Sequence, residues 1–133
     1  MKNSYGFVLI QPQLGENIGA SARSLKNFGF NNLIITNPKC DWPNIKAKAT
    51  SVGAYNIIKK AKICSNVIDA VSQFDIVFSL SSRRRDINKK HISLNDFHNI
   101  IKRKNLNIGL MFGPEASGLS NKDLSFSNYI LQI

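Results

Sequence analysis

The fold is decided by residues 5–36, which read YGFVLIQPQLGENIGASARSLKNFGFNNLIIT. Residues 5–11 form an apolar run typical of a buried strand, and residues 17–28 then repeat apolar side chains at helical spacing. Gly29 ends the expected helix, and residues 32–36 form a second apolar strand. A strand, a helix and a strand in this order predict a parallel pair of strands joined by a helical crossover.

The rest of the chain continues the alternation of strands and helices. Further strands are expected at residues 55–58, 75–80, 107–112 and 128–133, and further helices at residues 44–52, 65–74 and 93–104, the last capped by Ser93. Strands of near-continuous hydrophobicity separated by helices indicate an α/β fold, a mostly parallel sheet with helices on both faces. In such sheets ligands bind at the carboxyl ends of the strands, so the loops there are the place to look for chemistry.

Length and charge narrow the class of protein. A chain of 133 residues that is 43% hydrophobic suits one globular domain over residues 1–133. Eighteen Lys and Arg residues against eight Asp and Glu residues give a net charge of +10, which favours a polyanionic partner such as nucleic acid. The lysine-rich composition that an AT-rich genome produces is the alternative source of this charge.

Several other classes are disfavoured. No apolar run is long enough to span a bilayer, and no secretory signal is visible, so a cytoplasmic location is expected. Cys40 and Cys64 lack the spacing of a metal site or a disulfide framework, so no metal is expected. His91 and His98 have no Ser or Cys nucleophile beside them and are interpreted as surface residues.

The first unusual loop, residues 11–23, reads QPQLGENIGASAR. Asn17 stands where a helix N-cap is expected, and the small residues 19–22 leave the first turns open to close approach by a backbone or a phosphate. Arg23 lies just beyond them and offers a planar set of donors to a phosphate or ribose. An ordinary capped helix that packs its small residues on the sheet is the alternative.

The second loop, residues 79–86, reads SLSSRRRD and directly follows a buried strand. Its three consecutive arginines place positive charge at the expected ligand edge, and its serines add hydroxyl groups. This combination favours contact with an RNA backbone. The alternative is a charged surface that contacts only solvent.

The third loop, residues 112–121, reads FGPEASGLSN. Gly113 and Gly118 have the spacing that opens a P-loop, but Leu119 and Ser120 replace the Lys-Ser/Thr pair, and Glu115 would repel phosphates. The pattern fits a tight turn that lets a neutral or cationic ligand lie against backbone amides and carbonyls. A purely structural turn is the alternative, and a nucleotide-binding switch has only the incomplete glycine spacing in its favour.

Together the first and third loops resemble the first two motifs of the SpoU/TrmH-type RNA ribose 2′-O-methyltransferases of the SPOUT superfamily. The matching residues run from Pro12 to Arg23 and from Phe112 to Ser120. Trp42-Pro43, residues 47–54 and residues 81–85 are similar to the tRNA methyltransferases of that family that modify the ribose at position 32 of the anticodon loop. The resemblance covers essentially the whole chain.

This resemblance implies an α/β knot fold, S-adenosylmethionine as methyl donor, tRNA as substrate and a homodimer whose subunits share the active site. Arg23 matches the catalytic arginine, and Asn17 and Glu115 are further catalytic candidates. The cofactor-binding candidates are Ser79, Leu80, Ser81, Gly113, Glu115, Gly118, Leu119 and Ile133. The family more often has Thr at the position of Leu80. The candidates for contacts with tRNA are Arg83, Arg84, Arg85, Lys46, Lys48, Lys59 and Lys60.

Two alternatives concern the reaction. The chain ends at Ile133, where the family continues into a third motif, so a domain truncated at its C-terminus with an incomplete knot is expected. A catalytically inactive RNA-binding remnant is therefore the alternative to an active methyltransferase. Arginine is a poor base, because its guanidinium normally keeps its proton. Arg23 therefore either accepts the proton of the 2′-hydroxyl in a perturbed form or fixes the 2′-oxygen and the adjacent phosphate.

Overall fold

The computed structural model of the protein describes residues 2–82, 87–102, 105–115 and 117–132. The strands are β1 (Ser4–Ile10), β2 (Leu33–Thr36), β3 (Lys62–Cys64), β4 (Ile76–Ser81), β5 (His91–Ile92), β6 (Asn107–Phe112) and β7 (Tyr129–Gln132). The helices are α1 (Gly15–Asn27), α2 (Ile45–Thr50), α3 (Tyr55–Lys60), α4 (Val67–Val71), α5 (Leu94–Ile100) and α6 (Asn121–Leu124). Strands and helices alternate along most of the chain, as expected.

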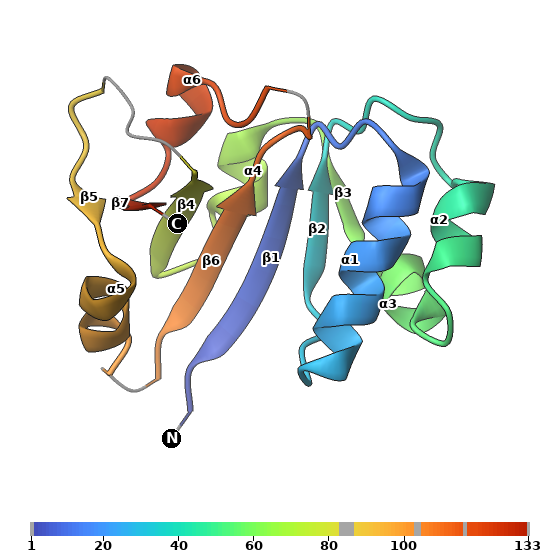
Figure 1. The fold of residues 1–133 in the computed structure, drawn as a ribbon, viewed down its shortest axis with the longest axis horizontal. Coiled ribbons are helices and arrows are strands. Elements are labelled where there is room, and N and C mark those ends of the chain that lie inside the picture. The colour runs from blue at the N-terminus through green and yellow to red at the C-terminus, as the bar shows by residue number, and fades with distance from the viewer. Residues whose placement is uncertain (1, 83–86, 103–104, 116, 133) are drawn as a thin grey trace.

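These strands form one sheet in the order β3-β2-β1-β6-β4-β7-β5 (Figure 1). Each pair of neighbouring strands in this order is parallel. Phe7 of β1, for example, lies opposite Leu33 of β2 and Leu110 of β6. The expected parallel α/β sheet is confirmed.

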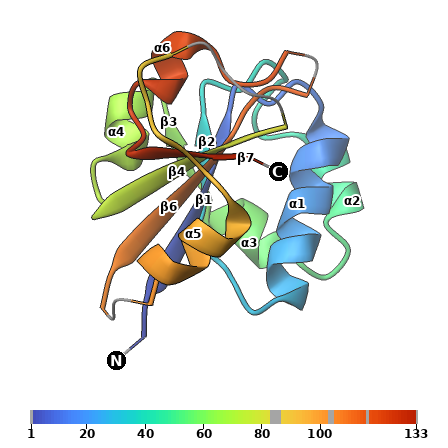
Figure 2. The same cartoon turned by 60° about the vertical axis from the view of Figure 1, so that its left-hand side comes forward.

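Both faces of the sheet carry helices, because the side chains of a strand alternate between the two faces. On β1, Val8 and Ile10 enter one core cluster with α4 and α6, whereas Phe7 and Leu9 pack against the cluster of α1, α2 and α3 on the opposite face. α2 packs against α1, and Figure 2 shows both helices on the same side of the sheet. Helices on both faces are therefore confirmed.

A third core cluster joins β4, β5, β6 and β7 to α5. The ring of Phe78, which is fully buried, meets the ring of Phe97 edge-on at a centroid distance of 4.7 Å. Ser93 caps α5 by accepting a hydrogen bond from the backbone of Asp96, whose carboxylate accepts one from the Ser93 backbone. The N-cap expected at Ser93 is confirmed, although the helix ends at Ile100 and not at residue 104.

The strand expected at residues 55–58 is wrong, because these residues begin helix α3. Ala54, Ile57 and Ile58 recur at helical spacing and are all buried in the cluster that α1 shares with β2. Two adjacent isoleucines in a short run satisfy a strand pattern and a helix pattern equally well, so burial against α1 decides between them.

Three short elements were not expected. β3 is an edge strand of three residues beside Thr36, and its Ile63 remains 43% exposed. β5 has two residues and α6 has four. Elements this short do not contain enough residues to show a periodic pattern of apolar side chains, so the sequence does not predict them.

Candidate active site

The three unusual loops extend from the same edge of the sheet. The first follows β1, the third follows β6 and the second follows β4, and these strands are neighbours in the order β1-β6-β4. In a parallel sheet the carboxyl ends of adjacent strands lie together, so the fold gathers loops that are far apart in sequence. Figure 1 shows these strand ends at the upper edge of the sheet.

Helix α1 begins earlier than its sequence indicates. The expected cap at Asn17 is wrong: α1 begins at Gly15, its N-cap is Leu14, and the backbone N–H of Asn17 already donates to the carbonyl of Leu14 at 3.2 Å. Asn17 therefore lies in the first turn with an exposed side chain. The missed signal was Glu16, because acidic residues favour the first turn of a helix over later positions.

The small residues of α1 allow close approach by another helix of the same chain. A Cβ at Gly19 would collide with the Thr50 hydroxyl and with the backbone carbonyl of Ala47, both on α2. A Cβ at Gly15 would likewise collide with the Asn44 side chain. The space that Gly19 leaves on α1 is thus occupied by α2 of the same chain, so at this position the small residue serves internal packing, against α2 and not against the sheet.

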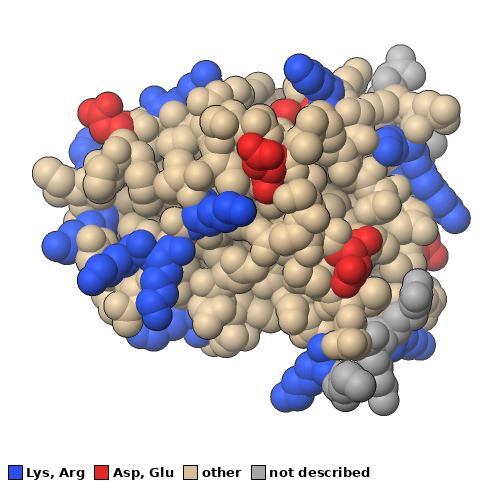
Figure 3. Space-filling view, turned by 180° about the vertical axis from the view of Figure 1, so that it is seen from behind, with Lys and Arg blue, Asp and Glu red and all other residues tan. Residues whose placement is uncertain are grey.

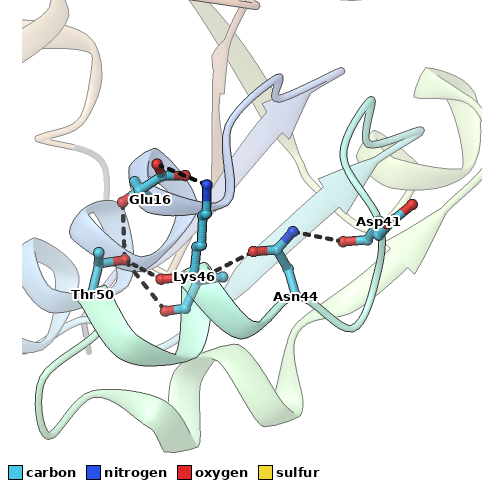
Figure 4. A network of polar contacts seen from close by, with 6 residues as sticks. Glu16, Asp41, Asn44, Lys46 and Thr50 are labelled. Atoms are coloured by element: carbon cyan, nitrogen blue, oxygen red, sulfur yellow. Dashed lines mark hydrogen bonds and ion pairs between the residues drawn. The ribbon is translucent and has the colours of Figure 1, made fainter.

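Polar contacts hold α2 in this position (Figure 4). The Asn44 carboxamide accepts from the backbone N–H of Ala47 at 3.0 Å and donates to the carbonyl of Asp41 at 3.1 Å. The Thr50 hydroxyl lies 3.1 Å from the carbonyl of Glu16 on α1. The Glu16 carboxylate in turn lies 3.9 Å from the Lys46 ammonium on the exposed surface, a contact that contributes little.

Arg23 lies on the exposed side of α1, eight residues after Gly15 and so about 12 Å further along the helix axis. Asn17 instead lines an apolar groove between α1 and the sheet, together with Phe7, Leu9 and Phe112. The fold places Arg23 and Asn17 on the same helix but on different sides of it.

The third loop folds back on itself. The backbone N–H of Gly118 donates to the carbonyl of Pro114 at 2.9 Å, and Gly118 has a φ of +71°, which favours glycine. A Cβ at Gly113 would collide with the backbone of Gly118 and Leu119. The expectation of a tight turn is confirmed, and both glycines are required by its geometry.

Glu115 connects the third loop to the first. Its carboxylate accepts a hydrogen bond from the backbone N–H of Gln13 at 3.0 Å. The first loop is also joined to the loop after β2, because the N–H of Lys39 donates to the carbonyl of Pro12 at 2.9 Å. Two of the three loops, and the loop after β2, thus form one connected surface.

The cofactor-binding candidates that the structure describes lie in and after two adjacent strands, β4 and β6. Ser79 is fully buried, and its hydroxyl has no hydrogen-bond partner among the described residues. A buried hydroxyl without a partner costs about 1–3 kcal/mol and indicates a missing ligand or water. Ser81 is buried and Leu80 half-buried. Ile133, Arg83, Arg84 and Arg85 lie outside the described residues.

Leu119 belongs to the core. Its side chain is 2% exposed and packs in the cluster that contains α4 and α6. A ligand could therefore meet only the backbone at this position, whereas Gly118 is exposed.

A polar cleft of about 480 Å³ lies over the ends of β1 and β2. It is lined by Gln11, Thr36 and Asn37 on one side and by Ser117 and Gly118 of the third loop on the other. The Thr36 hydroxyl is buried and lacks a partner among the described residues. Sequence reasoning missed Thr36 and Asn37, although their position directly after a buried strand was the available signal.

The lysine candidates lie on α2 and α3, where Lys46, Lys48, Lys59 and Lys60 are all exposed. The Lys48 ammonium lies over the Tyr55 ring, 4.9 Å from its centroid. Figure 3 shows several basic side chains together at the left of the rear view, the side on which α2, α3 and β3 lie. These lysines therefore form a basic surface beside the loop that follows β2.

The described residues lack two kinds of feature. No cluster of three or more His, Cys, Asp or Glu side chains that could hold a metal ion was found there. No helix within the described ranges is long and apolar enough to cross a membrane.

The fold and these loops define a class: a parallel α/β domain whose ligand loops meet at the carboxyl edge of the sheet. The model of the SpoU rRNA Methylase family matches residues 5–133. The chain belongs to this family, and the seven-stranded sheet has the SPOUT methyltransferase fold.

Curated relatives and solved structures agree with this family. The tRNA (cytidine-2′-O-)-methyltransferase TrmJ of Sulfolobus acidocaldarius is 33% identical over 95% of this chain and 54% of its own length. The crystal structure of TrmJ from Z. mobilis superposes with a TM-score of 0.90, at 31% identity over 96% of this chain and 57% of that one. A probable methylase family protein from Haemophilus influenzae gives a TM-score of 0.87 at 30% identity, over 98% of this chain and 55% of that one. The chain spans about half the length of the curated relatives that it matches.

Proposed function

We propose that this chain transfers a methyl group from S-adenosylmethionine to a ribose 2′-hydroxyl of tRNA, at position 32 of the anticodon loop. The observation that carries the proposal is the meeting of the first and third loops at one sheet edge, joined by the Gln13–Glu115 hydrogen bond. The similarity to TrmJ proteins, whose names state tRNA 2′-O-methyl transfer to cytidine or uridine, supports the substrate. The proposal treats residues 1–133 as a single domain, and the three core clusters support this because they are built on the same sheet.

S-adenosylmethionine would supply an activated methyl group, and the residues of this chain would hold it at the ends of β6, β4 and β7. Ser79, Leu80, Ser81, Gly113, Gly118 and Leu119 are the proposed contacts, with Ile133 as a further one. The buried hydroxyl of Ser79, which has no hydrogen-bond partner among the described residues, supports this assignment, because a ligand or a water beside it would satisfy a buried polar group. Leu119 contributes through its backbone, since its side chain is in the core.

The main task of the protein in this reaction is to align the ribose 2′-oxygen with the methyl carbon. Alignment of this kind can supply about 7–11 kcal/mol of the barrier reduction. We assign Arg23 to hold the 2′-oxygen and the neighbouring phosphate, because a guanidinium donates hydrogen bonds and accepts none. Glu115 positions the first loop through Gln13, and Asn17 lies in the first turn of α1, the helix that carries Arg23.

Contacts with tRNA are proposed for the exposed lysines of α2 and α3 and for Arg83, Arg84 and Arg85. Each lysine that neutralises a phosphate should add about 0.7–0.9 to the slope of log affinity against log salt. Lys46, Lys48, Lys59 and Lys60 support this proposal by their exposure on one side of the molecule.

A homodimer is also proposed. The groove between α1 and the sheet, about 520 Å³, is lined by the aromatic side chains of Phe7, Phe28, Phe30 and Phe112, and Phe28 remains 78% exposed. Exposed apolar surface of this kind favours association with a second copy. Sedimentation velocity should show a dimer that Phe28→Ser weakens, and a monomer at all concentrations would contradict this part of the proposal.

The function is tested by methyl transfer to two tRNA transcripts that differ only at nucleotide 32, one with ribose and one with 2′-deoxyribose. The proposal predicts labelling of the first and none of the second. Arg23→Lys should lower kcat by roughly 10²–10³-fold, as expected for loss of a preorganised donor, without changing the shape of the pH–rate profile. A profile that changes shape would assign Arg23 as the base. A folded chain that binds tRNA without transferring methyl groups would be the inactive RNA-binding remnant.

A further inference from the structure

A pocket on the outer side of α2 lies apart from the three loops. It is about 280 Å³ in volume, close to the lower end of the ~300–1,000 Å³ range of ligand pockets. Its walls include Trp42, Pro43, Ile45, Lys48, Tyr55 and Lys59. Two aromatic rings, two lysines and apolar side chains thus surround one small cavity.

The rings of this pocket are accessible at the surface. Tyr55 is 39% exposed and Ile45 is 86% exposed, while Trp42 is half-buried and packs against the core cluster of α1, α2 and α3. Exposed apolar and aromatic side chains rimmed by polar groups mark interaction sites. The Trp42 ring is thus supported by the core and also contributes a wall to the cavity.

The positive charge around the pocket indicates which kind of partner binds there. Lys48 and Lys59 line it, and Lys46, Lys60 and Lys62 are exposed on the adjoining turns and on β3. The whole chain carries a net charge of +10. Aromatic rings interleaved with lysines form the arrangement by which proteins hold unpaired bases, since the rings stack on the base and the lysines pair with the phosphates.

The pocket is built before any ligand arrives. The Thr50–Glu16 contact and the close approach of α2 at Gly19 fix α2 on α1, and the Asn44 cap holds the first turn of α2 (Figure 4). The Lys48 ammonium lies over the Tyr55 ring, 4.9 Å from its centroid, and so links α2 to α3 in the wall of the pocket. A preformed site loses less conformational entropy on binding.

We propose that this pocket binds one unpaired nucleobase of the RNA by stacking on Trp42 and Tyr55, outside the site of methyl transfer. The proposal rests on the proposed tRNA substrate and specifies how the RNA is held beside the loops. Trp42 follows β2 in the same loop as Lys39, which contacts Pro12 of the first loop. A base in the pocket would therefore belong to a nucleotide other than the methylated one, held on the side of the loop after β2.

The test uses the fluorescence of Trp42, which is the single tryptophan of the chain. The protein is titrated with hexauridylate, with an abasic oligonucleotide that carries the same number of phosphates, and with tRNA. Stacking predicts that hexauridylate and tRNA quench Trp42 and that the abasic strand does not. Tyr55→Leu should weaken the binding of hexauridylate by roughly 5- to 150-fold, the range for one base–aromatic stack.

A charge-matched pair of variants separates stacking from general attraction. Lys48→Met and Lys2→Met each remove one positive charge, but Lys2 lies at the amino end of β1, away from this pocket. The proposal predicts that Lys48→Met reduces the base-dependent quenching and that Lys2→Met does not.

The outcomes distinguish this proposal from the proposed function. If tRNA is bound and methylated while the Trp42 fluorescence does not change, the proposed base pocket is wrong and the proposed methyltransferase function is still supported. Equal quenching by the abasic strand would also overturn it. Base-dependent quenching without any methyl transfer would support the pocket and contradict the proposed function.

Discussion

At the residue scale, the most informative contact is the hydrogen bond between the Glu115 carboxylate and the Gln13 backbone N–H, at 3.0 Å and 102 residues apart in the chain. An ionised acceptor makes this bond stronger than a neutral one, although its exposure limits the net contribution. A carboxylate at position 115 would repel a phosphate. The structure gives Glu115 a different role, because its carboxylate holds the backbone of the first loop through Gln13. We therefore expect Glu115 to affect the geometry of the site more than the stability of the whole protein.

Replacement of Glu115 by alanine should therefore remove this hydrogen bond to the Gln13 amide with little loss of stability. We expect the free energy of unfolding to fall by less than about 1 kcal/mol, because the amide is exposed and can bond to water. Hydrogen exchange at the Gln13 amide should accelerate clearly. Glu115→Gln, which retains an acceptor, is the matched control and should preserve most of the protection. Unchanged exchange in the alanine variant would show that the bond does not form in solution.

Cys40 provides a prediction for pH. Burial raises the pKa of the Cys40 thiol, with smaller contributions from the negative charges of Asp41, Glu115 and Glu16. The folded state thus binds this proton more tightly than the unfolded state, and the corresponding stability is present below the unfolded pKa and lost as the pH rises through the folded pKa. Alkylation of Cys40, followed by peptide mass spectrometry, should rise at higher pH than in a denatured control. A rise at the same or a lower pH would contradict this.

At the element scale, the contact between α1 and α2 is made possible by glycine. Gly19→Ala would place a Cβ against the Ala47 carbonyl, a backbone atom that cannot move without shifting α2. The helix gains propensity from alanine, but the overlap should outweigh it and lower the stability by about 1–3 kcal/mol. Ser24→Ala, at an exposed position of α1, is the control and should be neutral or slightly stabilising. Chemical denaturation measures both, and a Gly19→Ala protein as stable as the wild type would contradict the packing.

The elements also show what sequence reasoning can reach. The spacing of apolar residues predicted the long apolar strands, the crossover helix α1 and the parallel sheet. The assignment of residues 55–58 failed because tertiary burial of Ile57 and Ile58 decides an ambiguous pattern. The predicted start of α1 is too late in the chain, because asparagine is a residue type that favours the N-cap position and the sequence therefore predicts the cap at Asn17. In the structure the helix begins at Gly15, which packs against the Asn44 side chain.

At the scale of the whole molecule, strand order determines the candidate site. The order β1-β6-β4-β7 places segments near residues 13, 115, 80 and 131 on consecutive strand ends, although the chain order is different. Sequence reasoning found the three loops because each follows a buried strand. It missed Thr36, Asn37 and the pocket at Trp42, since these depend on how loops and helices pack side by side.

The central claim is that loops on three adjacent strands of this chain form a binding site for S-adenosylmethionine. Calorimetric titration of the folded protein with S-adenosylmethionine tests it most directly. Ser79→Val is the matching variant, because it replaces by a methyl group a buried hydroxyl that has no partner in the described part of the chain. We predict saturable binding of one molecule per chain with a micromolar dissociation constant, weakened at least severalfold in the variant. A protein that is folded by circular dichroism and releases no heat of binding at any cofactor concentration would contradict the claim.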